Sequence, residues 1–241
     1  MGRLKLMPTR DEIAAEEIRL QISYVSDCEP QLRVLENAML LLGDLMSSVE
    51  PPAGSLNPGE VGMPDPDRRP ERFMLFTQMM IGARALRVVQ AARPVLAAGY
   101  ELEALVFDRI LVELMTHRRQ VLLDATGDEA RQWLFSPCGR GIGKRIAKVA
   151  KGDLYDLQSR AAHGDPRLLE PILDAERNIV PLAPARSDLT RSSLALHASF
   201  LTDQIEIIAV LAGLKNPGLA PLQEAVRVQW QQFRPGQDPT L

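Results

Sequence analysis

The stretch YELEALVFDRILVELMTHRRQVLLD, residues 100–124, decides the fold of this chain. At about 100° per residue, its apolar side chains cover a broad part of a helical wheel. These side chains are Phe107, Ile110, Leu111, Leu114, Val121 and Leu122. A helix that is apolar on nearly all sides is usually buried. We therefore predict an all-α multi-helix bundle around a central buried helix at about 100–124.

Two groups of polar side chains interrupt this apolar helix. One narrow arc, which we expect to face solvent, holds Glu101, Asp108 and Arg119. The other stripe holds Arg109, Glu113 and His117, which are successive i, i+4 neighbours whose side chains can touch. Because an unpaired buried arginine is costly, we expect Glu113 to accept hydrogen bonds from both neighbours. Two interpretations stay open: an internal ion-pair ladder that fixes the helix register, and the polar wall of a site.

The composition resembles that of ordinary soluble proteins and narrows the classes of function. Hydrophobic residues make up 46% of the sequence and charged residues 24%. The formal net charge of -3 gives no overall attraction to nucleic acid or to an anionic membrane. The most apolar run, residues 73–83, is too short to span a bilayer. The N-terminus has no apolar signal core, so we expect a cytoplasmic protein without a membrane partner.

The first fifty residues read as two helices. One is predicted at about 10–28, and Pro30 starts the next. Apolar residues of the second recur at three- and four-residue steps: Leu32, Leu35, Met39, Leu42 and Met46. We predict an N-terminal helical hairpin over 1–50, which either packs on the main body or serves as an oligomerisation arm. Residues 51–70 are dense in proline and glycine and are predicted to form a linker.

The remaining chain is predicted to form a main helical domain, 71–213, and a short C-terminal helix with a tail, 214–241. The helix that starts the main domain is expected to break at Pro94 and Gly99. Ser187 can cap a last long helix that reaches Ala212.

Residues 138–152, CGRGIGKRIAKVAKG, form the only dense basic run. The cations that we single out in it are Arg140, Lys144, Arg145 and Lys148. The run is not a Walker loop, because Cys138 stands where a glycine is required and Arg145 follows Lys144. It is either a solvated helix face or an anion-binding patch, since clustered cations bind phosphate without an exact motif.

Few residues indicate catalysis or metal binding. The sequence has neither HExxH, nor a Glu-x-x-His pair, nor a GxSxG elbow, so we expect no metal site and no cofactor. Cys28 and Cys138 are expected to be reduced thiols. His197 is expected to be packed or hydrogen-bonded in the core. His163 ends the segment YDLQSRAAHGD beside Arg160, and is either a helix C-cap or a proton-transfer group.

Two sets of motifs carry a resemblance to known families. Arg109-x-x-x-Glu113, together with a degraded Tyr-x-x-x-Ser-x-x-x-His-Gly pattern that begins at Tyr155, resembles a bacterial all-helical family known only as a domain of unknown function. This resemblance covers roughly residues 71–212. It implies a helical fold and a long C-terminal helix, and it brings no established activity.

The chain also resembles, more distantly, the HEPN superfamily of helical RNA-binding and RNA-cleaving domains. Active members carry Arg-Asn-x-x-x-His near the end of a helix. His163 matches this motif, whereas Gln158 and Ser159 stand in place of the arginine and the asparagine. The resemblance implies RNA as a partner and His163 as the catalytic residue, and the missing cation would come from Arg160 or from residues 140–151.

The sequence supports two hypotheses of function. The first is a HEPN-like domain that binds or cleaves RNA. The second is a non-catalytic interaction module that forms a homo-oligomer through the N-terminal hairpin. The sequence leaves open whether the protein is an enzyme.

Overall fold

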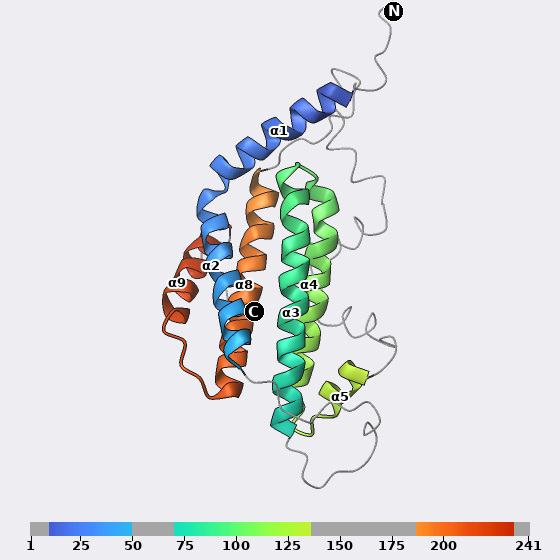
Figure 1. Ribbon diagram of the computed structural model, residues 1–241, viewed down its shortest axis with the longest axis vertical. Helices are drawn as coiled ribbons and strands as arrows, with labels where there is room; N and C mark the ends of the chain where they lie inside the picture. The colour runs from blue at the N-terminus through green and yellow to red at the C-terminus, as the bar shows by residue number, and fades with distance from the viewer. Residues whose placement is uncertain (1–9, 50–69, 136–186, 234–241) are drawn as a thin grey trace, which may run out of the picture.

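The computed structural model describes residues 10–49, 70–135 and 187–233, which form helices packed against one another (Figure 1). The helices are α1 (Arg10–Asp27), α2 (Glu29–Ser48), α3 (Pro70–Ala97), α4 (Glu101–Leu123), α5 (Asp128–Phe135), α8 (Ser187–Ala212) and α9 (Leu219–Phe233). No strand occurs within these ranges. The prediction of an all-α multi-helix bundle is confirmed.

Helix α8 lies at the centre of the described bundle. It packs against α2, α3, α4 and α9, whereas α4 packs against α3, α5 and α8. The helix predicted at 100–124 is therefore present as α4, but the central position belongs to α8. By length and composition α8 could cross a membrane, yet 67% of its most apolar window is buried by the other helices, as in a core helix.

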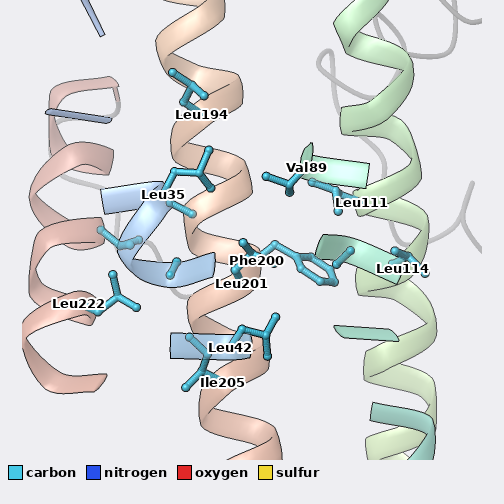
Figure 2. Close-up of a cluster of buried hydrophobic side chains, with 14 of the residues drawn as sticks. Leu35, Leu42, Val89, Leu111, Leu114, Leu194, Phe200, Leu201, Ile205 and Leu222 are labelled. Carbon is cyan, nitrogen blue, oxygen red and sulfur yellow. The ribbon is translucent and has the colours of Figure 1, made fainter. Parts of the chain in front are cut away.

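Apolar side chains of α2, α3, α4 and α9 meet those of α8 in one core (Figure 2). Phe200 points from α8 towards Leu114 of α4, and Leu201 and Ile205 lie towards Leu42 of α2. Phe200 and Leu42 are fully buried. Because α8 sends large side chains in both directions, the α3–α4 pair and the α2–α9 pair share one core.

The turn between α3 and α4 is made by Gly99, which has a φ of 82°. The amide of Gly99 donates to the Leu96 carbonyl and that of Tyr100 to the Val95 carbonyl, both at 3.0 Å, as in a Schellman C-cap. The expected break at Pro94 is wrong, because α3 continues through it to Ala97. Pro94 is exposed, so water can donate to the carbonyl that loses its helical partner.

Helices α1 and α2 do not form the predicted hairpin. Cys28 alone separates them, and the hydrogen bonds from Cys28 to Tyr24 and from Leu32 to Cys28 carry the helical pattern across the junction. A single residue cannot reverse the chain, so α1 bends away from α2 and lies across the end of the bundle (Figure 1). Cys28 is a buried free thiol, as expected, and burial raises its pKa.

Helices α2 and α9 are both part of the bundle. Helix α2 packs against α8 and α9, and α9 packs against α8. The division of the chain into 1–50, 51–70, 71–213 and 214–241 stays a prediction. Nearly all of the predicted linker lies outside the described residues.

Candidate functional site

The predicted site residues fall into a described group and a group outside the described ranges. His163 and Arg160, which were the catalytic candidates, lie outside them. So do Cys138 and the anion-binding candidates Arg140, Lys144, Arg145 and Lys148. The structure does describe the polar stripe of α4, which consists of Arg109, Glu113 and His117.

The first step of the predicted ion-pair ladder on α4 is present. Arg109 Nε lies 3.1 Å from Glu113 Oε1, and both side chains are partly buried. One turn further on, the His117 ring lies against the Trp133 ring of α5, with 6.4 Å between ring centroids and an interplanar angle of 58°. The contact between Glu113 and His117 stays a prediction. Within the described residues, this stripe holds α4 to α5 and keeps an arginine paired.

The polar arc of α4 that was expected to face solvent faces α8 instead. Glu101 is 5% exposed and Asp108 2% exposed, whereas Arg119 is exposed as predicted. The expectation for Glu101 and Asp108 is therefore wrong. The physical reason is that α8 carries hydroxyl and imidazole groups where these two carboxylates meet it, so that the carboxylates can be buried with partners.

Asp108 uses both of its carboxylate oxygens on α8. Its Oδ1 lies 2.7 Å from His197 Nε2, and its Oδ2 accepts a hydrogen bond of 2.6 Å from Ser193 Oγ. Two turns earlier, Thr190 donates to Glu101. His197 is thus packed and hydrogen-bonded, as predicted.

Sequence reasoning missed this contact although the spacing contains a signal for it. Thr190, Ser193 and His197 recur at steps of three and four, and Glu101 and Asp108 are seven residues apart. Each set lies on one helical face. Two short polar stripes of complementary chemistry, each on an otherwise apolar helix, are typical of two helices that face each other.

Arg118, which is buried, makes a second polar contact between α4 and α8, with the half-exposed Asp203. Its Nη2 lies 3.0 Å from Asp203 Oδ2, and its Nη1 donates to the Phe200 carbonyl at 3.3 Å. The guanidinium also lies over the Phe200 ring, 4.7 Å from the centroid. Burial lowers the pKa of Arg118, and the charge of Asp203 opposes this shift.

Two glutamines extend the polar contacts to α3. Gln204 Nε2 donates to the main-chain carbonyl of Gln78 at 2.8 Å and to its side-chain oxygen at 3.0 Å. Gln78 in turn donates to the carbonyl of Arg118 at 3.4 Å. A polar network therefore links α3, α4 and α8.

These buried contacts are suited to fixing helix register and not to catalysis. A general acid or base must come within hydrogen-bond reach of a substrate. His197 is fully buried, and its neighbours Asp108 and Ser193 are almost fully buried. Among the described residues there is also no group of three histidine, cysteine, aspartate or glutamate side chains that could hold a metal ion.

Helix α1 presents an apolar surface to solvent, and we call this surface the outer face of α1. It consists of Ala15, Ile18, Ile22 and Val25, which are all exposed. Ile18 is 58%, Ile22 67% and Val25 59% exposed, which is unusual for three large apolar side chains on one face.

The opposite side of α1 holds it to the end of the bundle. Leu20 is buried, and Tyr24 packs against the core. Tyr100, next to the start of α4, donates from its hydroxyl to Glu17 Oε1 at 3.2 Å. Helix α1 is therefore docked on one side and bare on the other.

A second apolar surface is a groove of about 380 Å³ between α2 and α9. Val34, Leu40 and Leu41 line it from α2, with Pro221, Leu222 and Ala225 on the α9 side. The polar groups Asn37 and Asp44 stand on its α2 side. This groove is a second place where a partner could bury apolar area.

Comparisons of the chain with family models, with curated proteins and with solved structures give no match. The resemblances to a bacterial domain of unknown function and to the HEPN superfamily therefore stay predictions. The outer face of α1 and the α2–α9 groove are candidates on geometry alone.

Proposed function

We propose that this protein is a non-catalytic helical interaction module that self-associates through the outer face of α1. The observation that carries the proposal is the exposure of Ile18, Ile22 and Val25 on one face of a helix that is docked by its other face. Single exposed apolar residues are normal on proteins, but three at this spacing form a continuous stripe.

The free energy available from this stripe suits a reversible association. Burying the exposed part of each of the three large side chains gives roughly 1–2 kcal/mol, and two copies would bury six of them. Association opposes this gain with a cost of roughly 4–15 kcal/mol in lost motion. We therefore expect a dissociation constant in the micromolar range, and a protein whose mass depends on its concentration.

The test is the mass of the full chain by sedimentation from about 1 to about 200 μM, which brackets the expected constant. Wild-type protein is expected to shift from one chain to two across this range. Ile18→Glu combined with Ile22→Glu is expected to hold the mass at one chain, because two buried carboxylates per copy would be left without partners.

The matched control makes the same chemical change on another exposed surface. Val210→Glu combined with Val228→Glu replaces exposed apolar residues of α8 and α9, and is expected to leave the association unchanged. Circular dichroism checks that each variant stays helical. A wild-type mass of one chain at every concentration, or a dimer that survives both α1 substitutions, would refute the proposal. A loss of mass with Leu40→Glu alone would assign the association to the α2–α9 groove.

A second proposal, RNA binding, rests on the basic run of residues 138–152, which lies outside the described residues. The motivating observation is that clustered cations bind phosphate without an exact motif. Lys144→Glu with Arg145→Glu is expected to weaken binding of labelled RNA at low salt, and His163→Ala is expected to abolish cleavage and spare binding. An absence of both binding and cleavage by wild-type protein at low salt would reject this proposal.

A further inference from the structure

The spacing of the outer face of α1 reads the same in both directions. Ala15, Ile18, Ile22 and Val25 are separated by three, four and three residues. This is the a/d spacing of a coiled coil, in which the side chains of one helix fit between those of the next. Because the pattern is symmetric about the level of Leu20, a helix of this sequence is complementary to its own copy turned end to end.

We infer that the occupant of the outer face of α1 is the α1 helix of a second copy of this chain, paired antiparallel about a two-fold axis at the level of Leu20. This inference rests on the proposed self-association and adds its partner surface, direction and register. Ile18 of each copy then packs against Ile22 of the other, and Ala15 against Val25. At both ends of the seam, the small Ala15 of one copy packs against the larger Val25 of the other, so the two helices can approach closely.

Charge favours the antiparallel direction over the parallel one. Asp11 lies one turn before Ala15 on the same exposed face, and Glu12 follows it. Parallel helices would bring the Asp11 carboxylates of both copies together in the seam. In the antiparallel register the two Asp11 residues are eighteen residues apart in level, which is about 27 Å. That separation exceeds the screening length of about 10 Å at ordinary ionic strength.

The sides of the seam carry little unbalanced charge. Ala14, Gln21 and Ser26 flank it and are neutral. Arg19 also flanks it, but its Nε and Nη2 lie 2.9 Å and 2.5 Å from the carboxylate oxygens of Glu16. The two arginines near the axis would thus arrive already paired with acids of their own chain.

The pairing is closed at two copies. A two-fold axis uses the same surface on both partners, so no further outer face of α1 remains after one dimer has formed. The macrodipoles of the two helices also run in opposite directions, which places the positive end of one beside the negative end of the other. We therefore expect a discrete dimer and not a filament.

The test is disulfide cross-linking of full-length chains with single added cysteines. Protein with Ile18→Cys and protein with Ile22→Cys carry tags of different mass and are mixed under mild oxidation. A disulfide needs Cα atoms within about 7 Å. The inference predicts that the mixed 18–22 cross-link forms at least about ten times faster than the like cross-links, because in this register only the 18–22 pair is level. Wild-type protein, with its native Cys28 and Cys138, gives the background rate.

The outcomes separate this inference from the proposed function. Faster 18–18 and 22–22 cross-links in a protein whose dimer is lost with Ile18→Glu and Ile22→Glu would show parallel helices; the inference would fall and the proposed function would stand. Equal rates for all three cross-links would likewise overturn the register. A wild-type chain that stays monomeric by sedimentation would remove both, and would indicate that the outer face of α1 is covered within its own chain.

Discussion

At the scale of single residues, Asp108 joins α4 to α8 by contacting two side chains at once. His197 and Ser193 both reach its carboxylate within 2.7 Å, and all three side chains are shielded from water. A buried carboxylate is tolerated only when such partners surround it. The Asp108 carboxylate therefore fixes how α4 and α8 pair, and its removal is expected to destabilise their interface.

Asp108→Ala is expected to lower the free energy of unfolding by about 3 kcal/mol, since it leaves His197 and Ser193 buried without their acceptor. Ser193→Ala removes one hydrogen bond only and is expected to cost about 1 kcal/mol. Urea unfolding of the two variants measures both values. Equal losses would show that the carboxylate does not act as a shared acceptor.

Tyr24 predicts how stability changes in alkali. Burial raises the pKa of Tyr24 to about 12, from 10.0, with the charge of Arg93 opposing the shift. Because the pKa of Tyr24 is raised in the folded state, its contribution to the free energy of unfolding is fully present below pH 10 and is lost as pH rises towards 12. The free energy of unfolding is expected to fall by about 2 kcal/mol over this range.

The measurement is the free energy of unfolding between pH 8 and 12 for wild type and for Tyr24→Phe, which keeps the ring and cannot ionise. The difference between the two proteins isolates Tyr24 from the other groups that titrate in this range. If both curves fall in parallel above pH 10, Tyr24 does not titrate with the shifted pKa.

The sequence predicts some of these residues and not others. The pair of Arg109 and Glu113 follows from i, i+4 spacing within one helix, and it is present. The pairs of Asp108 with His197 and of Arg118 with Asp203 join residues more than eighty positions apart. The pattern within one helix does not show which of its polar arcs faces another helix. The helical wheel therefore predicts, wrongly, that Asp108 faces solvent.

At the scale of secondary structure, two helices end in the same way. Helix α8 stops at Gly213, which has a φ of 66°, and Leu214 N–H donates to the Ala209 carbonyl at 2.9 Å. Gly99 ends the chain of hydrogen bonds after α3 with the same pattern. Glycine is needed at both positions because a left-handed residue with a Cβ is strained.

Gly213→Ala is expected to destabilise the protein by about 1 kcal/mol. A Cβ there would meet nothing within 4 Å, so the loss would report backbone conformation alone. Gly43→Ala is the matched control: it lies inside α2, where a Cβ also meets nothing, and it is expected to stabilise by roughly 0.5–1 kcal/mol. Thermal or urea unfolding should therefore give opposite signs for the same chemical change.

The bounds of the helices were easier to predict than their arrangement. The last long helix begins within one residue of the predicted start and ends at Ala212 as predicted, where Gly213 follows a long apolar stretch. The N-terminal pair has nearly the predicted helices but not the predicted hairpin, since periodicity says where a helix is apolar and not which way the chain turns. The direction of the chain depends on the connection between the two helices, which is the single residue Cys28 and is too short for a hairpin turn.

At the scale of the whole molecule, the bundle is organised by α8 and leaves the outer face of α1 uncovered. The fold class could be read from the sequence because every long apolar segment has helical periodicity. The central place of α8 could not, because α4 and α8 are both long and apolar, and only the packing of α2 and α9 on α8 distinguishes them.

Self-association also predicts a thermal signature. The melting temperature of wild-type protein is expected to rise with protein concentration, by about 2 °C for each tenfold increase. The reason is that only folded chains form the dimer, so association stabilises the folded state. The variant with Ile18→Glu and Ile22→Glu is expected to melt at one temperature at every concentration. Scanning calorimetry at several concentrations checks both, and a concentration-independent wild type would contradict the dimer.

The bend at Cys28 sets the direction of α1, so a small change at this residue moves the far end of the helix by a large distance. Helix α1 extends for about 27 Å beyond this joint, so a swing of about 10° carries its first residue through about 5 Å, close to a full helical pitch. Cys28 is 1% exposed, so a bulkier group in its place would have to displace the residues around it. Such a substitution would change the direction of α1 and leave the residues of its outer face unchanged. In a dimer joined through the outer face of α1, it would therefore change the angle between the two bundles.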